Sequence, residues 1–268
     1  MLIVLSGGSG VGKNTVIEGL LKKEEFALMP TYTTREKRPN ESAGNPYFFI
    51  SEKEFADKLK NGELYEHQRV HNHYYGASKI LLKEKLAGGK ILIKDIDVLG
   101  TQNLVKMASA DTRILTIFLK VDSLDVLIER LKARGEKEID LRLKRYNMEQ
   151  EHAKNYDYII TNNVLGETIN AVLQIVSAEN EKLTPIYTIA PTENSVDKAR
   201  SYAEALKNGQ TLSPIKIAFN DNKMYIIEGH HRYLASLMTG MKIAKEVVNA
   251  ASIKAVDQNY WNSIIEKL

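Results

Sequence analysis

The stretch "GGSGVGK", residues 7–13, constrains the fold of this chain more than any other feature of its sequence. It follows a short apolar run, "LIVLS" (2–6), and precedes a helix-like segment, "NTVIEGLLKK" (14–23). A G-x-x-x-x-G-K loop between a strand and a helix offers its backbone N–H groups and the positive end of the helix to a phosphate. The sequence therefore predicts a phosphate-binding loop in which Lys13 reaches the transferred phosphate.

Further apolar runs extend this pattern along the first two thirds of the chain. Residues 91–97, 114–120 and 156–161 are short and rich in Ile, Val and Leu, as in strands buried on both faces of a parallel sheet. Residues 123–135 have helical spacing, with Ser123 as the predicted cap and Gly135 as the predicted end. Strands that alternate with helices predict an α/β fold with a parallel core sheet.

The pattern changes near residue 182. Residues 167–183 form an amphipathic helical pattern, and "TPIYTIAPTENS" (184–195) then brings two prolines and a polar turn. We therefore expect one domain over 1–182 and a small α+β domain over 183–268. The second domain is predicted to contain a helix at 196–207, strands at 212–219 and 223–229, and a helix that begins at the histidines.

Composition excludes several kinds of chemistry. The 268 residues include no cysteine, which rules out disulfides, thiolate catalysis and cysteine metal sites. A formal net charge of +3 gives no reason to expect nucleic acid as a partner. No apolar run approaches the length of a membrane span, and the first run lacks the features of a signal peptide. We expect a cytoplasmic protein without a membrane partner. The sequence does not indicate an oligomeric state.

Two longer segments carry a resemblance to a known family. "TYTTREKRPNESAGNPYFFIS" (31–51) and "GELYEHQRVHNHYYGAS" (62–78) resemble the acceptor-binding segments of guanylate kinases. With the phosphate loop and "ILIKDID" (91–97), the resemblance covers residues 1–182. It implies a P-loop kinase fold with a parallel core sheet, a GMP-binding subdomain and a lid. The implied activity is phosphate transfer from ATP, with Mg²⁺, to GMP or dGMP.

The resemblance also implies which residues form the site. Glu66 corresponds to the carboxylate that accepts hydrogen bonds from N1–H and N2–H₂ of guanine, and arginines and a tyrosine bind the acceptor phosphate. Arginines of the lid close over the transferring phosphoryl group. The implied catalytic residues are Lys13, Arg130, Arg134 and Arg142; the ATP-binding residues are Gly7, Ser9, Gly10, Gly12, Lys13, Asn14, Thr15 and Asn162; and the GMP-binding residues are Thr31, Arg35, Arg38, Tyr47, Glu66, Tyr75 and Asp97.

Four departures from the family pattern bear on function. Asn14 replaces the hydroxyl residue that binds Mg²⁺, so we expect the metal to be held by the nucleotide phosphates or through water and by no protein metal site. Ala77 replaces a base-reading Ser or Thr, with Ser78 as a candidate substitute. Leu99 replaces a glutamine, and the lid loop "GEKEI" (135–139) is short.

These departures leave two function classes open. The chain is either an active kinase or a guanylate-kinase-like module that holds a nucleotide and recruits a partner. The retained Lys13, Arg35 and Arg38 favour catalysis. The exact acceptor, whether GMP, dGMP or a modified nucleotide, stays open.

A second candidate site lies in "YIIEGHHRYL", residues 225–234. A strand–Gly–His–His–Arg–helix junction directs backbone amides and a guanidinium towards an anion. The segment resembles the ParB/sulfiredoxin superfamily, which implies a nucleotide bound by Gly229, His230, His231 and Arg232. The missing cysteine argues against sulfiredoxin chemistry, and no DNA-binding helix-turn-helix follows. Glu193 is the candidate base if this domain is a second small-molecule kinase; a regulatory nucleotide site and a purely structural turn are the alternatives.

Overall fold

The structure, a computed structural model, describes residues 1–37, 43, 47–70, 72–107, 112–192, 194–249, 253, 258, 259, 262 and 265. Arg38 and Glu193 lie outside the described residues. The chain divides into two compact units. The first contains Met1–Ser6 and Lys13–Thr116, and the second contains Gly7–Gly12 and Ile117–Leu268.

The first unit is built on three parallel strands. β1 (Leu2–Ser6) pairs with β7 (Ile91–Asp95), which pairs in turn with β2 (Phe26–Leu28). Every residue of β1 is buried, which explains why this strand is a continuous apolar run rather than an alternating one. The strand predicted at 2–6 is confirmed, and the strand predicted at 91–97 is confirmed up to Asp95. The helices of this unit are α1 (Lys13–Leu20), α2 (Glu52–Lys60), α3 (Lys79–Ala87) and α4 (Val98–Met107).

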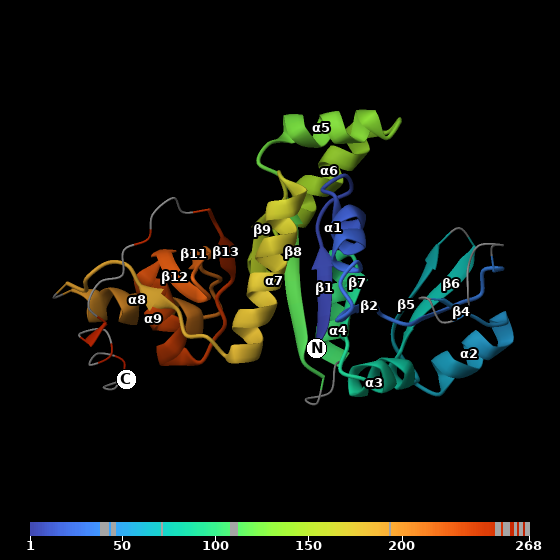
Figure 1. Ribbon diagram of the computed structural model, residues 1–268, viewed down its shortest axis with the longest axis horizontal. Helices are drawn as coiled ribbons and strands as arrows, with labels where there is room; N and C mark the ends of the chain where they lie inside the picture. Colours follow the sequence, from blue (N-terminus) through green and yellow to red (C-terminus); the bar gives the residue numbers. More distant parts are fainter. Residues whose placement is uncertain are drawn as a thin grey trace. The chain divides into compact units, whose positions relative to one another are not determined.

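A second sheet in the first unit carries most of the predicted acceptor residues. Its order is β4 (Tyr47–Phe49), β3 (Thr31–Thr33), β6 (His73–Ser78) and β5 (Leu64–Val70). Figure 1 shows this sheet to the side of β1, β7 and β2, with α2 beside it. A shared core joins the two sheets of this unit; it comprises Leu2, Val4, Met29, Tyr65, Ala77, Leu82, Leu92, Ile96 and Leu104.

The second unit contains a mostly parallel sheet. Its strand order is β10 (Ile186–Tyr187), β12 (Lys223–Glu228), β11 (Ile215–Asn220), β13 (Lys245–Val247), β9 (Tyr158–Thr161) and β8 (Ile114–Lys120, in this unit from Ile117). Only the β11–β12 pair is antiparallel among these described strands. Asp221 and Asn222, at the tip of that hairpin, both have positive φ, the conformation that a tight two-residue hairpin turn requires.

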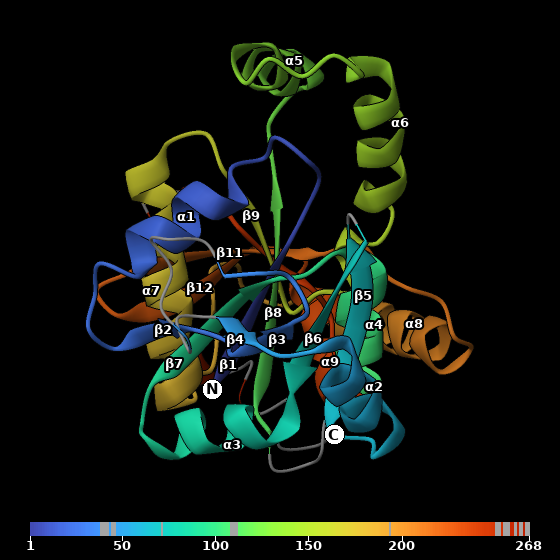
Figure 2. The ribbon, with the colours of Figure 1, turned by 90° about the vertical axis from the view of Figure 1, so that its right-hand side faces the viewer.

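Two helices form the predicted lid segment. α5 (Leu124–Ala133) is capped by Ser123, whose side chain accepts a hydrogen bond from Val126 N–H, and Gly135 adopts the left-handed conformation just after it. α6 (Ile139–Gln150) follows, and a short 3₁₀ turn spans Ala153–Asn155. Figure 2 shows α5 and α6 projecting beyond the end of β8. The predicted helix over 123–135 is therefore confirmed in its position and in its cap.

The segment after residue 182 extends the sheet that precedes it. α7 (Leu165–Glu181) ends at Lys182, which is left-handed, and β13 then pairs in parallel with β9 through Lys245↔Tyr158 and Val247↔Ile160. α8 (Ser195–Lys207) and α9 (His230–Thr239) pack together beside β11 and β12 (Figure 1). The boundary between the compact units does not coincide with 182/183, and an independently folding domain over 183–268 stays a prediction.

Among the described residues, no helix has both the length and the apolarity that crossing a bilayer requires.

Phe118 in β8 provides a test of the core of the second unit. The side chain is fully buried and its ring lies edge-on to Tyr156, with 5.2 Å between the ring centroids. Phe118→Ala is expected to lower the free energy of unfolding by about 3–5 kcal/mol, because it removes buried area and leaves a cavity. Urea denaturation measures this loss, with Met148→Ala as the control since Met148 is 69% exposed in the same unit. Similar losses in both variants would contradict the packing described here.

Candidate functional site

Glycines allow the phosphate loop to lie against the strands beside it. Gly7 has φ +139°, and a Cβ atom there would lie 2.2 Å from the carbonyl oxygen of Leu119. Gly12 has φ +94°, and a Cβ atom there would lie 2.5 Å from Nδ2 of Asn162. A side chain at either position would push the loop away from β8 and from the end of β9. The predicted roles of the loop glycines thus have a steric basis.

Two side chains hold the backbone of the loop at Val11. Asn162, 5% exposed, donates from Nδ2 to the Val11 carbonyl oxygen at 2.7 Å, and its Oδ1 accepts from the Thr168 hydroxyl at 2.8 Å. Arg130 donates to the same Val11 oxygen at 3.3 Å and to the Asn162 carbonyl oxygen at 2.8 Å. Asn162 is a predicted ATP-binding residue and Arg130 a predicted catalytic residue. In this structure both anchor the loop, a role that their spacing in the sequence does not reveal.

The other lid arginines occupy different surroundings. Arg134 is the exposed C-cap of α5, so it does not share the contacts of Arg130 although the two are four residues apart. Arg142 donates from Nε to Oε2 of Glu136 at 2.8 Å, and this hydrogen bond lowers the pKa of the Glu136 carboxyl. Because a guanidinium has five N–H donors, a phosphate can bind Arg142 without displacing Glu136.

The first unit contains a cavity of about 430 Å³ that brings together three predicted acceptor residues, Thr31, Tyr47 and Tyr75. The remaining residues that line it are Asn14, Ile17, Glu18, Leu21, Leu28, Met29, Ile93, Lys94 and Asp95. The rings of Tyr47 and Tyr75 meet edge-on at 5.9 Å. The Arg35 guanidinium lies 5.6 Å from the centroid of Tyr47. Arginine and tyrosines together form a suitable surface for a phosphate group.

Glu66, the predicted base-reading carboxylate, forms an ion pair with Lys94, a residue that is not among the predicted site residues. Lys94 Nζ lies 3.1 Å from Oε1 of Glu66 and 3.1 Å from the Thr31 hydroxyl oxygen. The side chains of Lys94 and Glu66 are only 13% and 8% exposed. The sequence signal for Lys94 is a positively charged residue that directly follows the apolar residues of β7.

The structure assigns local roles to two other residues near this cavity. The Asp97 carboxylate, predicted to bind GMP, accepts from Gly100 N–H at 2.8 Å at the start of α4 and is exposed. Ser78 caps α3 by accepting from Leu81 N–H at 3.2 Å. Successive residues of a strand point to opposite faces, so Ser78 does not replace the hydroxyl that Ala77 lacks.

Asp95, the last residue of β7, bears both on the lysine of the phosphate loop and on the binding of a metal ion. Lys13 Nζ lies 3.9 Å from Oδ1 of Asp95, within the first unit. Asn14 and Asp95 line the acceptor cavity and supply oxygen atoms, the donor type that Mg²⁺ prefers. No group of three or more His, Asp or Glu side chains placed to bind a metal is found in the described part of the chain.

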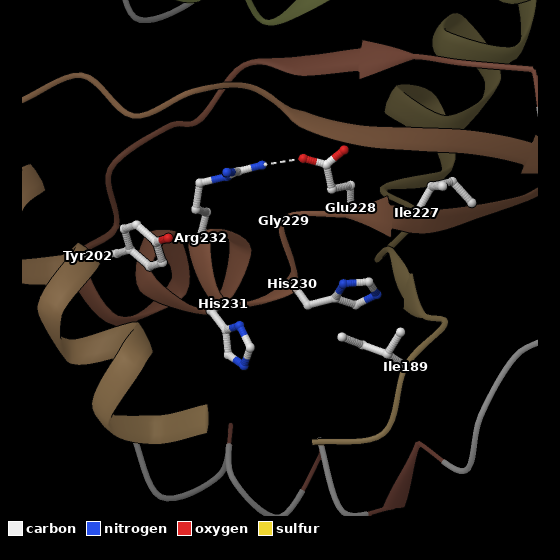
Figure 3. Close-up of a pocket in the computed structure, with 8 residues that line it drawn as sticks. All are labelled: Ile189, Tyr202, Ile227, Glu228, Gly229, His230, His231 and Arg232. Atoms are coloured by element: carbon white, nitrogen blue, oxygen red, sulfur yellow. Dashed lines mark hydrogen bonds and ion pairs between the residues drawn. The ribbon is translucent and has the colours of Figure 1, made fainter. Parts of the chain in front are cut away.

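The second candidate site lies in the second unit, where a pocket of about 310 Å³ is lined by Gly229, His230, His231 and Arg232 (Figure 3). Gly229 has φ +92°, and a Cβ atom there would lie 2.8 Å from Nη2 of Arg232. Arg232 donates from Nη2 to the Pro214 carbonyl oxygen at 3.2 Å and pairs with Glu228 at 3.5 Å. Its buried Nε has no hydrogen-bond partner among the described residues.

The two histidines point away from Arg232 and contact different elements. His230, 3% exposed, lies with Nε2 3.3 Å from Thr188 N, and His231 lies with Nε2 3.0 Å from the Ser195 hydroxyl. Figure 3 shows His231 and Arg232 on opposite sides of the helix start. The pocket therefore contains all four motif residues, but their side chains do not converge on one point.

Burial keeps both imidazoles neutral over most of the physiological range. Burial, followed by the charge of His231, lowers the pKa of His230 to about 4 from 6.5. Burial, followed by the charge of Lys198, also lowers the pKa of His231. Neutral histidines accept hydrogen bonds but bring no positive charge to a phosphate. Arg232 is thus the charged member of this motif.

His230 predicts a pH dependence of stability. Its pKa in the folded chain lies below the unfolded value of 6.5, so the unfolded state binds the proton more readily. The contribution of neutral His230 to the free energy of unfolding is complete above about pH 6.5. It is lost as the pH falls towards 4, and the full loss is about 3 kcal/mol. His230→Gln should flatten this part of the curve in urea denaturation at several pH values, whereas the exposed His67→Gln should not. Parallel curves for wild type and His230→Gln would contradict the burial of a neutral imidazole.

Comparison with known proteins gives a consistent assignment. The family model "Guanylate kinase" matches residues 1–179. Guanylate kinase of Bartonella henselae is 37% identical over 198 residues, which cover 73% of this chain and 88% of that protein. Guanylate kinase of Thermotoga maritima is 36% identical over 187 residues, which cover 68% and 89%. A solved guanylate kinase structure from Anaplasma phagocytophilum covers 67% of this chain and 85% of its own, at 30% identity and a TM-score of 0.48. With its phosphate loop and acceptor segments, this chain belongs to the guanylate kinase family and is a nucleoside monophosphate kinase, a transferase.

Proposed function

We propose that this chain transfers the terminal phosphoryl group of ATP to GMP or dGMP. The observation that carries this proposal is the acceptor cavity of the first unit. Its lining combines Tyr47 and Tyr75, the predicted phosphate-binding tyrosines, with Lys94, which donates a hydrogen bond to the predicted base-reading carboxylate of Glu66. Such a cavity suits a ligand with a phosphate and a base that offers N–H donors. GMP and dGMP have this combination.

The reaction requires positioning and charge stabilisation rather than a covalent intermediate. The backbone N–H groups of the phosphate loop and Lys13 would bind the phosphates of ATP, and Arg35, Arg38 and Tyr47 would hold the acceptor phosphate. Arg134 and Arg142 would neutralise charge on the transferring group. Asn162 and Arg130 support this step indirectly because they fix the loop at Val11.

Mg²⁺ is the expected cofactor, and the residues present are compatible with it. Mg²⁺ usually keeps several waters and binds through substrate phosphates and one or two protein oxygens. Asp95, beside Lys13, and Asn14, which follows it, are two of the oxygen-bearing residues that line this cavity, and they would contact the ion or its waters. When bound, Mg²⁺ would neutralise charge on the phosphates of ATP.

Lys13→Ala tests the kinase proposal. Removing the ammonium group that stabilises the transferring phosphate should lower kcat by about 10²- to 10³-fold. An assay that couples ADP release to a colour change measures turnover with each nucleoside monophosphate, and GMP or dGMP should be preferred. Lys22→Ala, a change at an exposed lysine shortly after α1, should behave as wild type.

Two outcomes would contradict this assignment. Turnover of no nucleoside monophosphate, together with equal ATP consumption by wild type and Lys13→Ala, would exclude it. Tight binding of GMP in calorimetry without ATP consumption would instead favour a nucleotide-holding module, the reading suggested by Asn14, Ala77 and Leu99.

We further propose that the pocket at Gly229–Arg232 binds a second nucleotide through its phosphate. The unpartnered Nε of Arg232 supports this, because a buried donor without a partner is costly and a phosphate oxygen would satisfy it. If Glu193 serves as a base towards a small hydroxyl compound, this part of the chain is a second kinase. Otherwise the site is regulatory.

Arg232→Ala tests the second site in the full chain. Calorimetry with a non-hydrolysable ATP analogue should show two sites on wild type and one on Arg232→Ala, since the main charged donor is lost. Arg200→Ala, at an exposed arginine of α8, should retain both sites. A stoichiometry unaffected by Arg232→Ala would remove this assignment. ATP consumption that depends on an added hydroxyl compound and is lost in Glu193→Gln would identify a kinase.

A further inference from the structure

We propose that Lys94 reads the acceptor base by donating a hydrogen bond to the O6 carbonyl of guanine. This inference rests on the proposed function of the acceptor cavity and names a specificity residue within it. Lys94 lines that cavity from β7, and its side chain is only 13% exposed. A buried cation inside an apolar strand is costly unless its protons find partners.

The hydrogen-bonding capacity of Lys94 leaves room for a ligand. An ammonium group has three N–H donors. One is directed to Glu66 Oε1 and one to the Thr31 hydroxyl oxygen, each at 3.1 Å. The third has no partner among the described residues and is available to an acceptor in the cavity that Lys94 lines. Glu66 likewise has capacity for more than one donor, since a carboxylate offers about four lone-pair positions.

The hydroxyl groups at the neighbouring positions are already committed or missing. The Thr31 hydroxyl donates to the Met29 carbonyl oxygen at 3.3 Å and accepts from Lys94. Position 77 is a fully buried alanine, and the Ser78 hydroxyl caps α3. Lys94 thus brings to the cavity a donor that these positions do not offer.

A lysine donor beside a carboxylate acceptor matches one kind of base edge. Guanine presents O6 as an acceptor next to N1–H and N2–H₂ as donors, so Lys94 and Glu66 can bind neighbouring atoms of one edge. Adenine presents an amino group where guanine has O6, and that group would face the ammonium with a second donor. Discrimination of this kind is large because the mismatch leaves buried polar groups unpaired.

A purely positioning role is the competing explanation, since Lys94 contacts both Glu66 and Thr31. The two explanations differ in which atom of the base they affect. If Lys94 reads O6, its loss changes the preference for ligands with O6. If Lys94 only orients Glu66, its loss also weakens recognition of the 2-amino group.

Binding of three monophosphates to the full chain separates these explanations. GMP has both groups, IMP lacks only the 2-amino group, and 2-aminopurine riboside monophosphate lacks O6 together with the N1 proton. Calorimetry gives Kd for each ligand on wild type, Lys94→Met and the control Lys85→Met, which changes an exposed lysine of α3. Met keeps the unbranched length of Lys without its charge or donors. Thermal unfolding checks that each variant is folded, and Lys94→Gln is the second variant if Lys94→Met is not.

Wild type should bind GMP at least about 10-fold more tightly than the 2-aminopurine ligand, the worth of a hydrogen bond to a charged group. Lys94→Met should reduce that ratio by about 10- to 100-fold. In Lys94→Met, the preference for GMP over IMP, measured as the ratio of their Kd values, should change little. Lys85→Met should leave the preference for GMP over either ligand unchanged. The assignment would be overturned if Lys94→Met lowered both preferences equally. It would also be overturned if wild type bound GMP and the 2-aminopurine ligand equally well. GMP turnover with such a result refutes this inference alone, whereas no GMP binding by wild type refutes the proposed function as well.

Discussion

The carbonyl oxygen of Val11 is the acceptor on which the geometry of the phosphate loop depends. It receives hydrogen bonds from Asn162 and from Arg130, which come from the end of β9 and from α5. Asn162 is itself oriented by Thr168 of α7. A single backbone atom therefore links a loop, a strand end and two helices. The glycines at 7 and 12 are required because side chains there would collide with Leu119 and Asn162. A loop fixed in this way presents its amides without further ordering when phosphate binds, which reduces the entropic cost of binding.

Much of the architecture follows from the sequence because its elements are locally encoded. β1 is a continuous apolar run, as its complete burial requires, and α5 follows Ser123, whose side chain caps it. Motif spacing predicts Thr31, Tyr47 and Tyr75 as acceptor residues, and the structure gathers these three at one cavity. Contacts that depend on folding were not predictable in the same way. Neither the attachment of Arg130 to Val11 nor the pairing of Lys94 with Glu66 follows from a local pattern.

The motif "GHHR" shows the same limit. Its place at a helix start was correctly predicted, and α9 begins at His230. The directions of its side chains depend on what packs around the helix start. The Thr188 N–H donates to His230, and the Ser195 hydroxyl is hydrogen-bonded to His231. Arg232 donates to the Pro214 carbonyl oxygen. These three partners come from segments that are distant in sequence, so the motif alone does not show that the side chains diverge.

The pairing of β13 with β9 has a consequence for solubility. Without residues after 182, one side of β9 would present unpaired N–H and C=O groups next to β8, in a strand whose residues Tyr158, Ile159 and Ile160 are buried. Exposed apolar edges of this kind are templates for pairing with other chains. In the full chain the row of strands continues from β13 through β11 and β12 to β10, a strand of only two residues. The residues after 182 thus pair the four-residue strand β9 and leave the two-residue strand β10 at this margin of the sheet, where fewer backbone groups are open to pairing.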